Sequence, residues 1–249
     1  MVMRKLFDLA LSDPSLLELL AVIIGIVFCT ASFFYLFVQT GYEAGLIASP
    51  VNPFGSVKGY ISGLGHAPPV LSQSTIRLNA ARVFLNLLYG IKIEVWLIFM
   101  VALFITGYPI LARLRSTIIP GLSITGISLD RILWMCLLPV VLIYLGYSSL
   151  FLVMTASIFK FYFGVAFSTR FYLVSSSLVM FMLFLTLSFY IVFIITGKTY
   201  FGAMLGFILS LFMDRVRLDP YHLLLFSLLV NLFLIVLMHI IIRSRRVSI

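Results

Sequence analysis

Charged residues are scarce in this sequence of 249 residues. They make up 10% of the chain, whereas hydrophobic residues make up 63%, and an average soluble domain carries about 25% charged residues. In water, so much apolar sequence would leave large hydrophobic patches exposed. Several apolar runs also exceed the roughly 18 residues that suffice to cross a bilayer. The scarcity of charge therefore excludes a water-soluble fold and predicts an all-α polytopic membrane protein.

Residues that bind metals or perform catalysis are also few. The sequence contains two cysteines, three histidines and eight acidic residues. Cys29 and Cys136 lie in apolar runs at different expected membrane depths, which argues against a disulfide bond. The histidines are far apart, and the acidic residues lie almost entirely at the ends of apolar runs. We therefore expect no enzymatic activity, no cofactor and no metal site.

One short segment is similar to the end of a phosphate-binding loop. The residues Thr196-Gly197-Lys198-Thr199 match that end, but the loop also requires a glycine five positions before Gly197, where this chain has Val192. The preceding sequence is continuously apolar and is expected to be helical. We therefore predict a turn at the membrane edge and expect that this chain does not bind ATP by itself.

Basic residues outnumber acidic ones, and the formal net charge is +9. In a membrane protein this excess indicates basic loops beside anionic lipid rather than nucleic-acid binding. Both ends of the chain are basic, and an even number of spans would place both in the cytoplasm. The expected location is the plasma membrane.

The apolar runs predict six transmembrane helices, preceded by an interfacial helix over residues 1–13. Asp-Pro pairs at Asp13 and Asp219 mark the starts of the first and last spans. The fifth span would reach only about 22 Å, against a hydrocarbon core of about 30 Å, so a re-entrant segment is its alternative. The predicted spans are 14–38, 93–112, 132–157, 171–196, 199–213 and 220–242.

The segment 39–92 is predicted to be an extracellular cap. It begins as a loop rich in glycine and proline, and from about Ser74 an amphipathic helix leads into the second span. Lys92 and Glu94 would mark the outer membrane boundary, and Trp96 would be the interfacial anchor.

Small residues recur at four-residue spacing in two spans. The fifth span has Gly202, Gly206 and Ser210, and the first has Ala21 and Gly25 followed by Cys29. Such strips let helix backbones approach closely. They indicate packing within the chain or, alternatively, a dimer interface.

Asn231 is the polar residue expected nearest the bilayer centre. It lies about eleven residues into the last span, and a polar side chain at that depth is costly unless it faces protein or a water-filled cavity. The interpretations are an interhelical hydrogen bond or a place on a translocation path.

The segment 115–130, between the second and third spans, resembles the inner loop of type-2 ATP-binding-cassette (ABC) transporter permeases. Ser123-Ile-Thr125-Gly126-Ile-Ser128 lies where that family has a small-Thr-Pro-hydrophobic-Ser turn, with Gly126 in the place of proline, and Arg131 fits the basic position that follows. An acidic residue usual after the span-two arginine and a lysine usual early in span three are missing. The resemblance assigns contact with the ATPase to Ile118, Pro120, Leu122, Ser123, Ile124, Thr125, Gly126, Ser128 and Arg131.

The resemblance extends over nearly the whole chain and implies its function. Residues 1–249 would form a single permease domain of an ABC exporter that pairs with a second permease copy or a paralogue and is driven by separate ATPase subunits. The alternative is a non-catalytic accessory or anchor subunit of a larger membrane complex, in which the segment 115–130 would be an ordinary loop. The transported substrate is not indicated by the sequence.

Overall fold

The computed structural model describes residues 16–43, 73–118, 129–160, 167–216 and 218–244, and this part is helical with no strand. The protein is an all-α polytopic membrane protein, as predicted. Five of its helices are long and apolar enough to cross a bilayer, and α9 is a shorter apolar helix. The elements are α2 (Leu16–Glu43), α4 (Gln73–Gly90), α5 (Lys92–Arg113), the π-helical turn η1 (Leu114–Ile118), α7 (Leu129–Ile158), α8 (Thr169–Thr196), α9 (Thr199–Arg215) and α10 (Pro220–Ser244).

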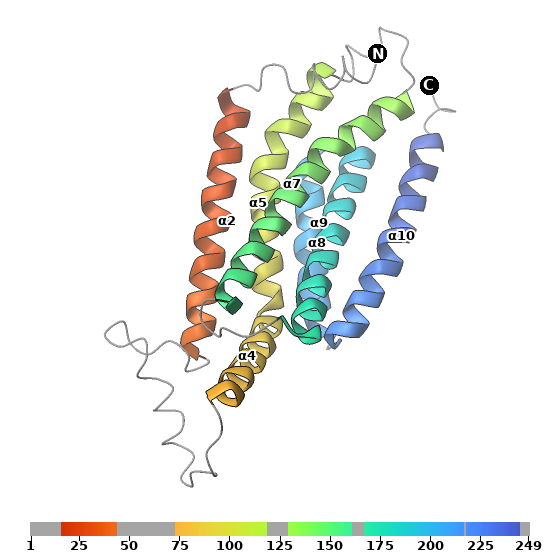
Figure 1. Ribbon diagram of the computed structural model, residues 1–249. Helices are drawn as coiled ribbons and strands as arrows, with labels where there is room; N and C mark the ends of the chain where they lie inside the picture. The colour runs from red at the N-terminus through yellow and green to blue at the C-terminus, as the bar shows by residue number, and fades with distance from the viewer. Residues whose placement is uncertain (1–15, 44–72, 119–128, 161–166, 217, 245–249) are drawn as a thin grey trace, which may run out of the picture.

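The long helices form a bundle with two distinct ends (Figure 1). At the connector end, α2 begins, α5 runs into η1, α8 ends and α10 ends. At the opposite end, which we call the α4 end, α4 lies at an angle to the bundle beside the start of α5. The interfacial helix at 1–13 and most of the predicted cap, 44–72, lie outside the described residues.

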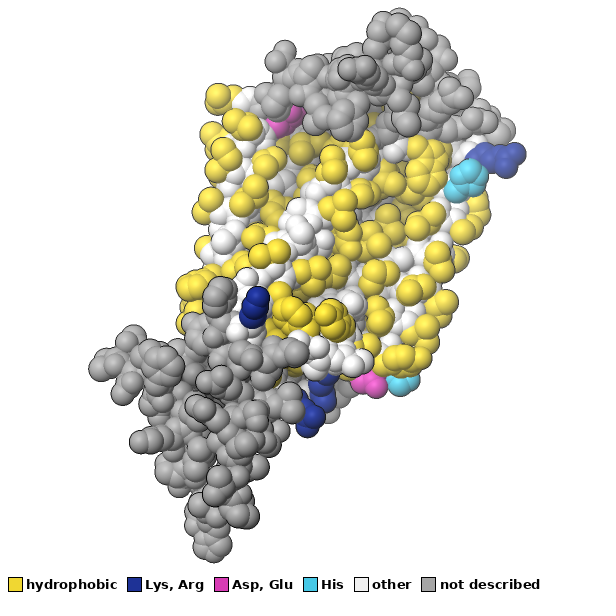
Figure 2. Space-filling model, viewed as in Figure 1, with side chains coloured by type: hydrophobic (Ala, Val, Ile, Leu, Met, Phe, Trp, Pro, Cys, Tyr) yellow, Lys and Arg dark blue, Asp and Glu magenta, His cyan; other side chains and the backbone are white. Residues whose placement is uncertain are grey.

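Helix α8 is the central helix of the bundle. Its sequence is apolar on all sides. In its most apolar stretch of 18 residues, 72% of the residues are buried, against 22% in the corresponding stretches of α2 and α10. A helix that is hydrophobic all round is expected to be enclosed by other helices. The edge helices α2 and α10 instead expose apolar residues outward, and Figure 2 shows hydrophobic side chains covering the visible flank between the two ends. This flank is suited to contact with lipid.

Helix α9 crosses the bundle from one end to the other. It begins at Thr199 beside the end of α8 and reaches Arg215 near the α4 end, and its 17 residues correspond to about 25 Å. The fifth span therefore does not turn back on itself within the bundle. Only residues 216–219 separate α9 from α10.

The helix expected to lead into the second span is interrupted just before it. Helix α4 ends at Gly90, and Ile91 lies between it and α5 with φ −92° and ψ 25°. Ile91 donates to the Leu87 carbonyl at 3.0 Å and accepts from Val95 at 3.3 Å. The two helices thus meet at a one-residue distortion, which two hydrogen bonds of helical spacing span.

Candidate functional site at the connector end

An ion pair joins the beginning of α2 to the end of α5. Arg113 Nη1 lies 2.8 Å from Glu18 Oε2, and Glu18 is 7% exposed. Glu18 lies in the first turn of α2 and Arg113 in the last turn of α5. Each charge therefore also complements the dipole of its own helix. The pair fixes two antiparallel helices to one another at the connector end.

A second arginine, two residues further along, caps α8. The Arg115 guanidinium donates a hydrogen bond to the Gly197 carbonyl. Gly197 adopts φ 68° and its N–H donates to the Phe193 carbonyl at 2.7 Å, which is the left-handed cap that commonly ends a helix. A Cβ at position 197 would lie 2.5 Å from Arg115 Nη1. The backbone conformation therefore favours glycine, and the missing side chain leaves room for the arginine.

The segment similar to a phosphate-binding loop is this same helix-capping turn. Thr196 Oγ1 donates to the Val192 carbonyl at 2.7 Å and accepts from the Lys198 N–H at 3.2 Å. These bonds direct the threonine hydroxyl to its own backbone, in agreement with the expectation of a turn at the end of the span.

Together, Arg113 and Arg115 attach the root of the connecting segment to two further helices. Ile118 closes η1 and Arg131 lies in the first turn of α7. We name the two contacts, Arg113 with Glu18 and Arg115 with Gly197, the connector clamp. The other predicted ATPase-contact residues lie outside the described residues: Pro120, Leu122, Ser123, Ile124, Thr125, Gly126 and Ser128.

The glycines of both small-residue strips lie against other helices of the same chain. A Cβ at Gly202 would lie 2.7 Å from the Phe189 carbonyl oxygen, and one at Gly206 would lie 2.2 Å from Met100 Cε. A Cβ at Gly25 would lie 2.2 Å from the Tyr147 hydroxyl and 2.5 Å from Thr106 Cγ2. Helix α9 therefore packs on α8 and α5, and α2 packs on α5 and α7.

The remaining members of the two strips are Ser210, Ala21 and Cys29. Ser210 is buried and donates to the Gly206 carbonyl at 2.9 Å, within its own helix. Ala21 is half-buried and Cys29 fully buried on α2.

Asn231 joins α10 to α8. Its side chain is buried, and Nδ2 donates to the Met180 carbonyl at 3.0 Å. Among the described residues, its Oδ1 and the buried Ser227 Oγ one turn earlier have no hydrogen-bond partner. The Asn231 side chain therefore makes an interhelical hydrogen bond, which was one of the two interpretations of this residue. Its Oδ1 accepts no hydrogen bond within the described part of the bundle.

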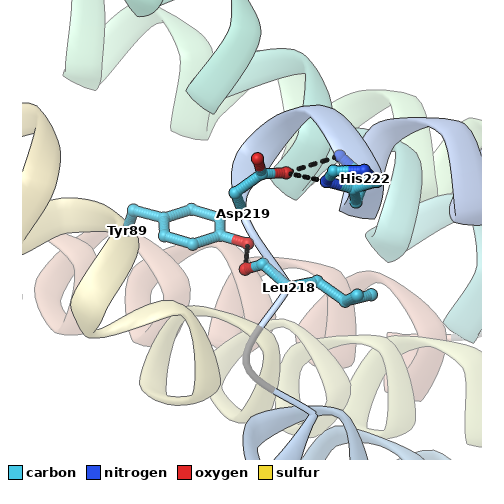
Figure 3. A network of polar contacts seen from close by, with 4 residues as sticks. All are labelled: Tyr89, Leu218, Asp219 and His222. Atoms are coloured by element: carbon cyan, nitrogen blue, oxygen red, sulfur yellow. Dashed lines mark hydrogen bonds and ion pairs between the residues drawn. The ribbon is translucent and has the colours of Figure 1, made fainter.

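Sequence reasoning missed the polar contacts at the α4 end. The Tyr89 hydroxyl donates to the Leu218 carbonyl at 2.5 Å, and Arg170 Nη2 donates to Asn86 Oδ1 at 2.5 Å. Figure 3 shows Tyr89 reaching from α4 to the short link before α10. The Lys92 ammonium lies 4.9 Å from the centre of the Tyr89 ring. The apolar residues of α4 predicted a buried face but did not identify these partners.

The link between α9 and α10 also carries the predicted Asp-Pro helix start. Asp219 Oδ1 accepts from the His222 N–H at 2.8 Å and lies 2.7 Å from His222 Nδ1. These bonds, above all the one from the His222 backbone, lower the pKa of the Asp219 carboxyl. Burial, with a smaller contribution from the Asp219 charge, raises the pKa of Tyr89 to about 12. The phenol therefore remains a hydrogen-bond donor at physiological pH.

The prediction for Trp96 was wrong. Trp96 is fully buried, and its ring centre lies 4.0 Å from that of Phe181 on α8. It packs inside the bundle because the α5 face that carries it meets another helix, so it cannot serve as an anchor at the lipid interface.

The described part of the chain contains no group of three or more histidine, cysteine or acidic residues that could hold a metal ion. No family model, curated protein or solved structure matches the chain significantly.

Proposed function

We propose that this chain is the permease subunit of an ABC exporter and is driven by separate ATPase subunits. The observation that carries the proposal is the connector clamp, which lies where the sequence leads into the segment 119–128. Arg113 holds α2 and Arg115 holds the end of α8. A force applied to the segment would therefore reach α2, α5 and α8 together.

Such an arrangement is suited to converting a soluble partner's motion into movement of helices. Closure of an ATPase dimer on ATP displaces whatever is docked on it, and packed helices respond as units because their cores are not continuously deformable. In this proposal the protein resides in the plasma membrane, with its connector end in the cytoplasm. A second permease copy or a paralogue completes the membrane part of the transporter.

The first test is copurification. The tagged chain, extracted mildly from its native membrane, should bring with it a soluble chain that carries a complete phosphate-binding loop and hydrolyses ATP. Single cysteines at Leu122 and Ile124 should crosslink to that chain. Recovery of a redox or secretion assembly without such an ATPase would contradict the proposal and favour the accessory or anchor subunit.

The second test concerns coupling through the clamp. Arg115→Ala should leave the ATPase bound but reduce several-fold the ATP hydrolysis that depends on the permease, because the connector then no longer holds α8. Arg243→Ala is the matched control, since it removes an exposed arginine from the same end of the bundle. Equal hydrolysis in the two variants would show that the clamp does not transmit the motion.

A further inference from the structure

Helix α4 contacts the bundle with two chemically different sides. On one side Phe84, Leu85 and Leu88 are buried, and the Phe84 ring lies 6.3 Å from that of Phe37 on α2. On the other side, Asn86 and Tyr89 make polar contacts with the start of α8 and with the link before α10. The apolar contact would be costly to expose to water, whereas the polar contacts can be exchanged for hydrogen bonds with water at little net free energy.

The polar contacts of α4 form two clasps. The first is the hydrogen bond from the Tyr89 hydroxyl to the Leu218 carbonyl, with Lys92 placed over the same ring. The second is the hydrogen bond from Arg170 to Asn86, between two exposed side chains. Each clasp joins α4 to the α8–α10 side of the bundle, the first through the link before α10 and the second through the start of α8.

The junction between α4 and α5 has the properties of a hinge. Ile91 alone separates the two helices and lies in the sparsely populated region between the α and β conformations. A Cβ at Gly90 would meet none of the described atoms within 4 Å. Glycine is therefore not required there by packing, and its main effect is to weaken helix continuity at that point.

From these observations we propose that α4 is a hinged latch at the α4 end of the bundle. The latch turns at Gly90 and Ile91, stays packed on α2, and releases its two clasps on the α8–α10 side when that end of the bundle opens. The inference rests on the proposed function and identifies a conformational control of it.

The experiment measures the distance between α4 and α10 in lipid nanodiscs. Spin labels would be attached to cysteines at the exposed positions Arg82 and Tyr221, because the native Cys29 and Cys136 are buried. Pulsed electron paramagnetic resonance should give one dominant distance. Tyr89→Phe should increase a longer-distance population roughly fivefold, which is the ratio for loss of one hydrogen bond of about 1 kcal/mol.

Matched variants separate the latch from general loosening of the bundle. Tyr172→Phe removes the hydroxyl of an exposed tyrosine near the same end and should leave the distances unchanged. Gly90→Ala should reduce the longer-distance population by stiffening the hinge, while Gly146→Ala, at another glycine with open space in the described structure, should not. Unchanged distances in Tyr89→Phe would overturn the latch.

A final arm tests the role of the latch in transport. In the complex with its ATPase, trapping with ATP and vanadate should favour the longer distance, and no change on trapping would overturn opening during transport. Failure to recover an ATPase would count against the proposed function alone, because the comparison of Tyr89→Phe with Tyr172→Phe uses the permease without a partner.

Discussion

The two glycines of α9 face obstacles of different rigidity. A Cβ at Gly202 would strike a backbone carbonyl of α8, whereas one at Gly206 would strike the end of the Met100 side chain. Backbone cannot shift without moving the helix, but a methionine side chain adapts readily. We therefore expect Gly202→Ala to destabilise the protein by about 1–3 kcal/mol and Gly206→Ala to have a clearly smaller effect.

Thermal unfolding in detergent would measure this difference. Gly146→Ala is the control, because the described atoms leave space for a Cβ at this position and alanine favours the helix. The thermal unfolding midpoint of this variant should be unchanged or slightly raised. An equal loss for Gly202→Ala and Gly206→Ala would mean that α9 does not pack on α8 as closely as described.

Asp219 is expected to stabilise the start of α10 in a pH-dependent manner. The folded-state pKa of its carboxyl is lowered, first by the His222 N–H, so its contribution is present above the unfolded pKa and is lost as the pH falls through the folded pKa. Asp219→Ala should lower the unfolding midpoint at neutral pH. Asp219→Asn should lower it less, because asparagine also caps helices.

Lowering the pH provides the internal check on that interpretation. The advantage of the wild type over Asp219→Asn should shrink toward acid pH as the carboxyl is protonated. A constant difference across the acid range would show that the charge of Asp219 does not contribute.

At the scale of helices, the ion pair of Glu18 with Arg113 and an apolar face both hold the described part of α2 in position. Glu18 is 7% exposed, but the Arg113 side chain is 28% exposed, so water screens the pair in part. A coupling of about 1–2 kcal/mol is expected, between the values of exposed and fully buried pairs. Glu18→Gln and Arg113→Gln should each destabilise the protein, and the double variant should lose less than the sum.

A double-mutant cycle measured by thermal or denaturant unfolding would give this coupling. Glu94→Gln, an exposed acidic residue in the first turn of α5, should be close to neutral. Additive losses from Glu18 and Arg113 would show that the two side chains do not stabilise one another.

The membrane-crossing helices were predictable, but the faces by which they pack were not. Long apolar runs and the Asp219-Pro220 pair located most helix limits within a few residues, because length and capping are local properties. The burial of Trp96 and the contact of Gly25 with Tyr147 depend on which helix lies opposite. Arg113 and Arg115 could be placed at a helix end from the sequence, but their partners Glu18 and Gly197 come from helices 95 and 82 residues away.

At the scale of the whole molecule, the described contacts of arginine side chains with other helices lie at the two ends of the bundle, while Asn231 joins α10 to α8 between them. The connector clamp joins α2, α5 and α8 at one end, and the clasps of α4 join α4, α8 and the link before α10 at the other. Helix α8 takes part in both. A displacement of α8 along its axis would therefore act on the clamp and on the latch at once, which connects the proposed function with the further inference.

The short helix α9 provides a test of this two-ended arrangement. Because it leads from Gly197 at the connector end to the link at the α4 end, Lys198 and Arg215 should lie on opposite sides of the membrane, although 17 residues reach only about 25 Å. Local thinning of the bilayer accommodates such a mismatch at modest cost.

In intact cells, an impermeant maleimide should label a cysteine at Arg215 and spare one at Lys198 until the membrane is permeabilised. A cysteine at Arg82 should follow Arg215, and one at Arg243 should follow Lys198. Labelling of positions 198 and 215 from the same side would contradict a transmembrane α9, and with it the assignment of the connector clamp and the α4 latch to opposite membrane surfaces.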